Sequence, residues 1–518
     1  MMTTEAATGD DSTPLLGDVV TGAVAFDGGP AHRSKSGSWK SASFIIGVEV
    51  AERFAYYGIS SNLITYLTGP LGESTAAAAA AVNAWNGAAM LLPLLGAFVA
   101  DSFLGRYRTI IIASLLYILG LGLLSLSAAL HSSNSSPPLF EVAFFFFSIY
   151  LVAFAQGGHK PCVQALGADQ FDEEDETELV AKSSFFNWWY FSMNAGICVA
   201  QLVLSYIQEN LSWELGFGIP CIMMCFALVV YLLGSTTYRF RVRSSQKNPF
   251  VRISSALAAA AARAEPEDPE QSSGIEEAKE LVRIAPIWAS CLGYAVMFAQ
   301  ATTLFTKQGA TMDRSLAFGL QIPSASLQCL TGLSIVAFIP VYDRILVPTA
   351  RAMTKRSMGI TTLERIGAGI SLSIVFMVVA AIVERQRISV AIKHGLLDRP
   401  EATVPMSVWW LAPQYVLLGI ADVFTMVGLQ EFMYDQVPND LKSLGSALYL
   451  SIFGVGSFIS GFLISIIDSI TSRADGIGWF SDNLNRAHLD YFYWLLVGIT
   501  AATLLPYFYF ANSYVYKI

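Results

Sequence analysis

Long apolar runs recur along the chain from residue 41 to residue 512, and they constrain its fold more than any other feature. About 20 apolar helical residues are needed to cross the hydrocarbon core of a bilayer, where backbone groups must hydrogen-bond within their own segment. Twelve segments reach this length, so the sequence predicts an all-α polytopic membrane protein. The predicted spans are 41–67, 76–99, 108–130, 139–160, 184–207, 213–234, 286–306, 326–347, 363–384, 407–432, 443–468 and 489–512.

Composition excludes several other classes of protein. Hydrophobic residues make up 54% of the chain and charged residues only 14%, whereas about a quarter of an ordinary soluble chain is charged. The net charge of −9 argues against nucleic acid as a partner, because phosphate binding requires a basic surface. No histidine is followed by glutamate, so a zinc-protease His-Glu-x-x-His site is absent from the sequence. We therefore predict no enzyme and no metal site.

The polar stretch 235–285 divides the spans six and six, which is the layout of a secondary transporter built from repeats. We expect two six-helix bundles, over 41–234 and 286–512. The stretch between them is predicted to be a cytoplasmic linker, in which the alanine-rich segment 254–264 favours an additional helix. Residues 1–40 are expected to form a disordered cytoplasmic tail, and residues 513–518 a second, short one.

The orientation follows from the positive-inside rule. If the N-terminus is cytoplasmic, 21 Lys and Arg fall in cytoplasmic segments and eight in segments on the other side. This asymmetry predicts that both termini lie in the cytoplasm.

Several ionisable residues fall inside the predicted spans, where a charge costs several kcal/mol unless it is paired or reaches water. At 100° per residue, Glu52, Arg53 and Tyr56 lie within about 60° of Glu49, so all four share one helix face. That face cannot point toward lipid. We interpret it as a proton-coupling group; the alternative is a buried ion pair between Glu49 and Arg53 that only fixes helix packing.

Two more charges lie within or beside predicted spans, Lys160 and Glu431. The three glutamates outnumber the two bases, Arg53 and Lys160, which leaves one carboxylate unpaired. A carboxylate in a medium of low dielectric favours its neutral form, so the spare acid predicts a proton site. Alternating pairing with Lys160 would link proton occupancy to conformation.

Between the second and third predicted spans lies Gly96-Ala-Phe-Val-Ala-Asp101-Ser-Phe-Leu-Gly105-Arg106. Its glycines allow a tight turn, and Asp101 with Arg106 could clamp two helices together. The alternative is a plain cytoplasmic turn with an anchoring arginine. Asn194, in the fifth span, fits either a substrate cavity or a hydrogen bond to a neighbouring helix.

These segments together resemble the proton-coupled peptide and nitrate transporter family of the major facilitator superfamily, in its plant branch. The resemblance runs from Ser41 to Tyr514. It rests on Glu49-x-x-Glu52-Arg53, the 96–106 segment, Gly158-His-Lys-Pro-Cys-Val-Gln-Ala-Leu-Gly-Ala-Asp-Gln-Phe171, Gln308-Gly-x-x-Met-Asp313-Arg314 and Glu431-Phe-Met-Tyr-Asp-Gln436.

The resemblance implies the major facilitator fold, with twelve helices in two pseudo-symmetric halves that open alternately to each side. It implies no cofactor beyond protons as the coupling ion, and a small solute and the bilayer as partners, with no obligate protein partner. The residues it implicates are Glu49, Glu52, Arg53 and Lys160 in proton coupling, Tyr56, Tyr57, Asn194, Phe298, Gln300 and Glu431 in substrate binding, and Gly96, Asp101, Gly105 and Arg106 in a gating loop.

Nitrate and di- or tripeptides are the leading substrates under this resemblance. Phe298 stands near the position where nitrate carriers of the family can use a histidine, which weakens histidine-dependent nitrate binding without excluding nitrate. A hormone or specialised metabolite as cargo, and a nutrient sensor with transport secondary, stay open as alternatives. The tail segment Asp11-Ser-Thr-Pro-Leu15-Leu16 has the spacing of a vacuolar sorting signal, so the plasma membrane and the vacuolar membrane are both open.

Overall fold

The computed structural model describes residues 17–131, 138–172, 174–241, 279, 282–316, 319–355, 360–437, 442–475 and 478–516. Its architecture is overwhelmingly helical, as predicted. The N-terminal half contains α1 (Ser38–Ser60), α2 (Leu63–Thr68), α3 (Thr75–Val99), α4 (Arg106–Leu130), α5 (Leu139–Ala168), α6 (Glu176–Val199), α7 (Ser205–Asn210) and α8 (Trp213–Gly234). The C-terminal half contains a helical segment over 282–290, α11 (Leu292–Phe298), α12 (Leu304–Ala310), α13 (Cys329–Val341), α14 (Val347–Thr354), α15 (Thr362–Lys393), α16 (Ala412–Asp435), α17 (Lys442–Asp475) and α18 (Leu489–Ser513).

Ten helices in the described part of the chain are long and apolar enough to cross a membrane. Two other predicted spans differ from this pattern for physical reasons. The first, α1, carries charged residues near its middle, and the chain turns at Ser61 and Asn62 before α2 begins. The seventh is interrupted at residues 299–303, between α11 and α12.

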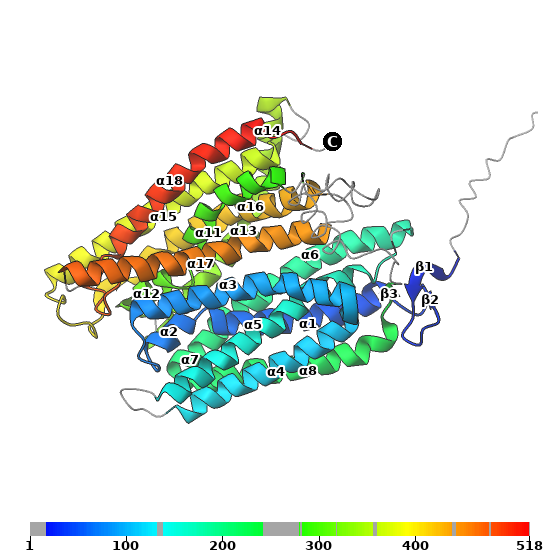
Figure 1. Cartoon of the computed structure of the whole chain (residues 1–518), viewed down its shortest axis with the longest axis horizontal. Helices are drawn as coiled ribbons and strands as arrows, with labels where there is room; N and C mark the ends of the chain where they lie inside the picture. The colour runs from blue at the N-terminus through cyan, green and yellow to red at the C-terminus, as the bar shows by residue number, and fades with distance from the viewer. Residues whose placement is uncertain are drawn as a thin grey trace, which may run out of the picture.

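The two halves form separate helical bundles, with the C-terminal bundle inclined to the N-terminal one (Figure 1). We call the end where β1, β2 and the C-terminus lie the terminal end, and the end where α2 and α12 lie the far end. The helices of the two bundles approach each other at the far end and diverge toward the terminal end (Figure 1).

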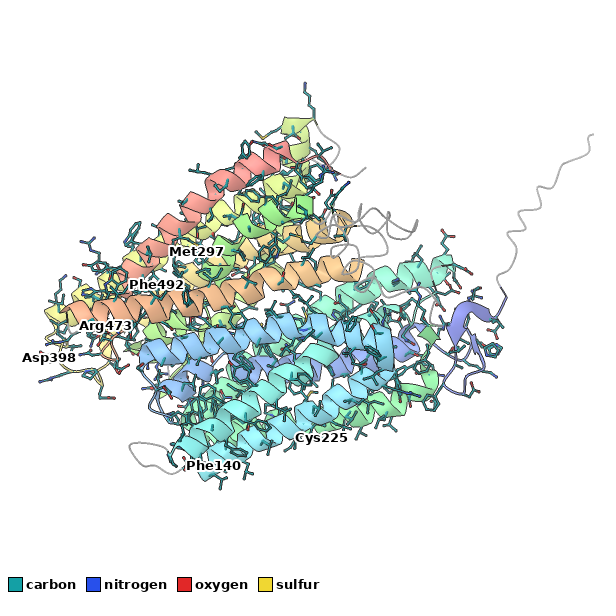
Figure 2. The ribbon with its side chains drawn as sticks, viewed as in Figure 1. Phe140, Cys225, Met297, Asp398, Arg473 and Phe492 are labelled. Carbon is teal, nitrogen blue, oxygen red and sulfur yellow. The ribbon has the colours of Figure 1, made fainter. Side chains whose placement is uncertain are left out.

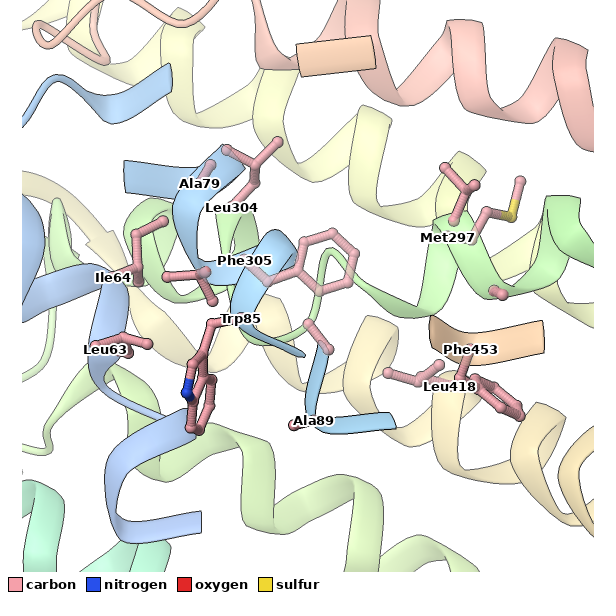
Figure 3. Close-up of a cluster of buried hydrophobic side chains, with 14 of the residues drawn as sticks. Leu63, Ile64, Ala79, Trp85, Ala89, Met297, Leu304, Phe305, Leu418 and Phe453 are labelled. Atoms are coloured by element: carbon pink, nitrogen blue, oxygen red, sulfur yellow. The ribbon is translucent and has the colours of Figure 1, made fainter. Parts of the chain in front are cut away.

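Hydrogen bonds between described residues of the two halves lie at the far end or near the middle of the helices. A buried apolar cluster accompanies them, and it includes Trp85 of α3 and Phe305 of α12 (Figure 3). The bonded pairs are Thr75 with Asp482, Lys307 with Thr68, Arg314 with Glu209, Ser326 with Gln201, Gln328 with Ser61, Asn86 with Thr302, and Asn83 with Ser460.

The outer surface of the bundles is apolar. Phe140 and Cys225 lie at the outer edge of the N-terminal bundle, away from the other half (Figure 2). Phe140 is 72% exposed, and many other large apolar side chains are exposed as well. A water-soluble monomer rarely exposes so many large apolar side chains, and this surface is of the kind that a membrane protein presents to lipid.

Several helix starts follow from local sequence. The Asp175 side chain accepts hydrogen bonds from the backbone N–H groups of Thr177 and Glu178, which caps α6. Thr361 and Glu364 form a capping box at the start of α15. Such caps satisfy N–H groups that have no partner within the helix.

The expectation of a wholly disordered tail is wrong for residues 17–37. Strands β1 (Val19–Val24) and β2 (Pro30–His32) pair antiparallel, and β3 (Phe240–Arg241), from the start of the linker, adds to the other edge of β1. A second, parallel pair joins β4 (Met312–Asp313) to β5 (Val404–Ser407) at the far end. The sorting-signal segment and the additional helix expected over 254–264 lie outside the described residues.

The Arg239 side chain is buried beneath this tail. It is 1% exposed and donates to both carboxylate oxygens of Glu178, at 2.6 and 3.0 Å, and to the backbone oxygen of Ser36, at 2.6 Å. Because a buried guanidinium needs such partners, residues 17–37 are part of the folded N-terminal half.

Candidate functional site

The charged face of α1 is buried inside the N-terminal bundle. Glu49, Glu52 and Arg53 are 4%, 0% and 3% exposed. The Arg53 guanidinium bridges the two acids: its Nε lies 2.9 Å from Glu49 Oε1, and its Nη2 lies 2.6 Å from Glu52 Oε2. Tyr117 of α4 donates to the other Glu52 oxygen at 3.3 Å. The helical spacing therefore gathers these charges on one inward face, as predicted.

Lys160 of α5 is half-buried, and its expected pairing with the acids of α1 is not formed in this conformation. Its ammonium donates to the Met90 sulfur at 3.8 Å, and among the described residues it forms no ion pair with a carboxylate, since Arg53 bridges Glu49 and Glu52. Arg53 already holds both acids. Lys160 thus interacts electrostatically with both acids without forming an ion pair with either of them in this conformation.

Tyr56 connects the charged face to the junction between the halves. Its hydroxyl donates to Asn86 Oδ1 at 3.1 Å, and its ring stacks on Trp85 at 5.2 Å between centroids. The Asn86 amide donates in turn to Thr302 of the C-terminal half, at 3.4 Å. Tyr57 is half-buried and packs edge-on against Tyr56.

The C-terminal half contributes Gln300 and Phe298. Gln300 is fully buried, and its amide donates to the Ser460 hydroxyl at 2.9 Å; the same hydroxyl accepts from Asn83 of α3 at 3.0 Å. The Ser460 hydroxyl therefore connects Gln300 to Asn83 of the N-terminal half. Phe298 is half-buried and packs edge-on against Phe453, at 5.4 Å.

The structure does not bring Glu431 to this group, so the predicted count of three acids against two bases, which left one carboxylate unpaired, is wrong. Its side chain is 47% exposed near the end of α16, and it pairs with Arg365 at 3.4 Å. The buried acid of α16 is Asp422, which is 3% exposed and accepts a hydrogen bond from the Tyr294 hydroxyl. Asp422 lies in the middle of the predicted span 407–432. Because a charge costs most at that depth, its position in the sequence was enough to indicate it as a candidate.

Asn194 of α6 donates to the Tyr190 backbone oxygen of its own helix, at 2.8 Å. It is half-buried and lies close to Gly332 of α13, in the other half. Among the described residues, the hydrogen bond predicted from Asn194 to a neighbouring helix is therefore not formed, and the residue lies where the two halves approach each other.

The segment 96–106 forms a tight connection at the terminal end. A Cβ added to Gly96 would overlap the backbone of Gly157, so α3 and α5 meet there with no room for a side chain. Gly105, with φ +78°, allows the turn into α4. Arg106 lies 3.7 Å from Asp101, as predicted, and also pairs closely with Asp169 at the end of α5. Asp169 is the clamp partner that sequence reasoning missed.

Comparison with known proteins identifies the family. The family model described as "PTR2: POT family" matches residues 107–267 and 264–480. The chain belongs to the POT family. It is 58% identical to the Arabidopsis thaliana protein NRT1/ PTR FAMILY 5.10, over 100% of this chain and 99% of that protein. It is 54% identical to NRT1/ PTR FAMILY 5.14 of the same plant, over 97% and 98%.

Solved structures of POT family members share the fold. An auto-inhibited POT family peptide transporter superposes with a TM-score of 0.74 at 22% identity, covering 92% of this chain and 98% of that one. The POT family transporter PepTSo gives 0.72 at 20% identity, covering 91% and 98%. These matches confirm the predicted major facilitator fold. POT family proteins are integral membrane transporters of small substrates, so the prediction that this chain is not an enzyme is confirmed.

Proposed function

We propose that this POT family member is a proton-coupled symporter that works by alternating access, with nitrate or di- and tripeptides as its leading substrates. The observation that carries the proposal is the buried triad of Glu49, Arg53 and Glu52, with Lys160 released beside it. Two acids and two bases at one buried point are electrically balanced only as a set. A proton on either acid would weaken its hold on Arg53 and let Lys160 or a substrate anion change partner.

The energetic requirement of uphill uptake is met by one proton. Each elementary charge that crosses the membrane field gains about 2.3 kcal/mol per 100 mV. One inward proton can therefore drive a neutral solute, or accompany a singly negative one, against its gradient.

Asp422 favours the peptide class over nitrate. Cationic Arg53 and Lys160 lie in the N-terminal half, and the carboxyl of Asp422 lies in the C-terminal half. A zwitterion presents a carboxylate to one half and an amine to the other, whereas nitrate would meet repulsion from an ionised Asp422. Nitrate transport would require that Asp422 be protonated during binding.

The closed far end and the basic segments support an orientation. The two termini, the linker and most of the Lys and Arg residues lie at one end of the predicted topology, which we assign to the cytoplasm by the positive-inside rule. The hydrogen bonds between the halves then lie on the opposite side or near the middle of the membrane, so this conformation faces inward. We place the protein in the plasma membrane or the vacuolar membrane.

Uptake of labelled nitrate and of a labelled dipeptide by oocytes, at external pH 5.5 and 7.5, tests the proposal. We expect acid-stimulated uptake that disappears in Lys160→Ala and Glu52→Gln while both variants still reach the membrane. Lys393→Ala, which removes an exposed lysine at the end of α15, should transport normally. Equal flux with and without a pH gradient would refute proton coupling.

A further inference from the structure

His159, the residue before Lys160 on α5, is a buried group that the coupling scheme above does not use. Its side chain is 0% exposed, and neither ring nitrogen has a hydrogen-bond partner among the described residues. A buried polar atom without a partner is destabilising, and most buried polar atoms in native proteins hydrogen-bond to protein or to water. His159 therefore needs an explanation, because both nitrogens of its buried imidazole lack partners among the described residues.

The histidine adjoins the acids of α1. One oxygen of Glu49, one oxygen of Glu52 and one ring nitrogen of His159 all lie within 4.8 Å of one another. The ring also packs edge-on against Tyr117, whose hydroxyl donates to Glu52. A single water molecule spans two polar atoms about 5 Å apart, so this spacing suits a water bridge between imidazole and carboxyl.

A second orphaned group lies one helical turn from His159. Gln156 is 0% exposed, and neither its amide nitrogen nor its amide oxygen has a partner among the described residues. The i and i+3 positions of a helix lie on the same side. Gln156 and His159 thus form a continuous polar strip inside the N-terminal bundle, on the far-end side of the acids.

The charges around this strip favour a proton over a metal ion. The ionisable groups around His159 are Glu49, Glu52 and Arg53 from α1 and Tyr117 from α4; Lys160 follows it on α5, and α3 contains no ionisable residue. Two ionised acids against Arg53 and Lys160 give a formal charge of zero. A divalent ion would add two positive charges in a medium of low dielectric, whereas a passing proton adds one, and only briefly.

We propose that His159 relays the coupling proton between the acids of α1 and water beside Gln156, at the other end of the polar strip. In this step the O–H bond of a protonated glutamic acid breaks and a bond forms to one imidazole nitrogen, through the bridging water. The carboxylate left behind pairs with Arg53. The other ring nitrogen then releases its proton to water beside Gln156, which restores the neutral ring. His159 is a positioning and relay residue, and the inference rests on the proton coupling proposed above.

The decisive variant is His159→Gln, which keeps a side chain that hydrogen-bonds but cannot exchange a proton. In proteoliposomes, uptake of the labelled dipeptide or nitrate driven by a pH gradient should fall at least tenfold. Exchange of the same labelled substrate at equal pH on both sides, which needs no net proton movement, should stay within twofold of the wild type. His159→Asn should behave alike, and His394→Gln, at an exposed histidine near the end of α15, should change neither rate.

The outcomes separate this inference from the proposed function. If the wild-type protein shows no response to a pH gradient, the coupling and the relay both fail. If the wild type responds and His159→Gln responds equally, the relay alone is wrong. Equal loss of driven uptake and exchange in both variants, with normal abundance and thermal stability, would also refute the relay, because it would show that His159 only holds the site together. A substrate-independent measurement is the infrared difference spectrum of purified protein between pH 5 and pH 8: the protonated-carboxyl band should shift in His159→Gln and stay unchanged in His394→Gln.

Discussion

The ion pair between Glu209 and Arg314 should help to set the balance between the two conformations of the proposed alternating-access cycle. Glu209 ends the fifth membrane segment of the N-terminal half, and Arg314 follows β4 in the C-terminal half. Arg314 Nη1 lies 2.7 Å from Glu209 Oε2, with side chains 23% and 12% exposed. Opening of the far end must separate these residues, so the pair stabilises only the closed state. We predict that Arg314→Gln or Glu209→Gln shifts the population toward the open one.

The size of the shift follows from the geometry. At 2.7 Å and an effective dielectric constant of about 20, the gross attraction is about 6 kcal/mol, but most of it is offset by the cost of desolvating both groups. A hydrogen bond to a charged group contributes about 1.5–3 kcal/mol net. Taking about 2 kcal/mol, the ratio of closed to open molecules should fall about 30-fold.

Distances between two spin labels across the far end would measure this change. Cysteines replacing Glu214 and Arg399, both exposed, provide the attachment sites in a background without the native cysteines. The single variants should convert a mainly short distance distribution into a longer one, and the charge exchange Glu209→Arg with Arg314→Glu should restore the short one. Arg486→Gln serves as the matched control, because Arg486 pairs with Asp398 within a single half.

An unchanged distance distribution in both single variants would refute the reasoning, since it would mean that the pair contributes nothing to closure. A shift of similar size in the distance distribution of Arg486→Gln would also refute the reasoning, because the loss of any charged side chain at the surface would then have the same effect.

Three further predictions test local features. Gly96→Ala should lower thermal stability by about 1–3 kcal/mol, because its methyl group would overlap the backbone of Gly157; a melting curve checks this. Asp175→Ala should cost about 1 kcal/mol by uncapping α6. Hydrogen bonds from Thr177 lower the pKa of the Asp175 carboxyl below 3.8, so the cap is fully present at neutral pH and is lost as the pH falls through that lowered pKa; wild type and variant should melt alike at the lowest pH. Asp422→Asn should reduce dipeptide uptake more than nitrate uptake in the two-pH assay.

The helical framework and the charged face of α1 could be predicted because both depend on local periodicity. Apolar run length gives the spans, and the spacing of Glu49, Glu52 and Arg53 places them on one face whatever the neighbouring helices do. The first and seventh spans could be predicted as well, although the charges within α1 and the break before α12 set both apart from the ten long apolar helices.

Contacts between distant segments could not be predicted from the sequence. The link from Gln300 through Ser460 to Asn83 depends on how α3 packs against α17, and β3 is too short to be recognised without its partner β1. The choice of Glu431 over Asp422 had a different cause. Glu431 qualifies both as a charge within the predicted span 407–432 and by a family motif, but it lies at the end of that span, whereas Asp422 lies near its middle, where a charge costs most.

The burial of Arg239 beneath residues 17–37 has a practical consequence for handling this protein. A shortened form beginning at α1 would lose the backbone oxygen of Ser36 and expose a guanidinium and its carboxylate partner to solvent at the root of the linker. Tags and fluorescent fusions are therefore better attached ahead of residue 17, or at the C-terminus, than substituted for the leading segment. If a protein that lacks residues 17–37 melts at a lower temperature than the whole chain, the loss of these contacts to Arg239 is the reason we expect. Transport rates measured on that shortened protein would not describe the intact carrier.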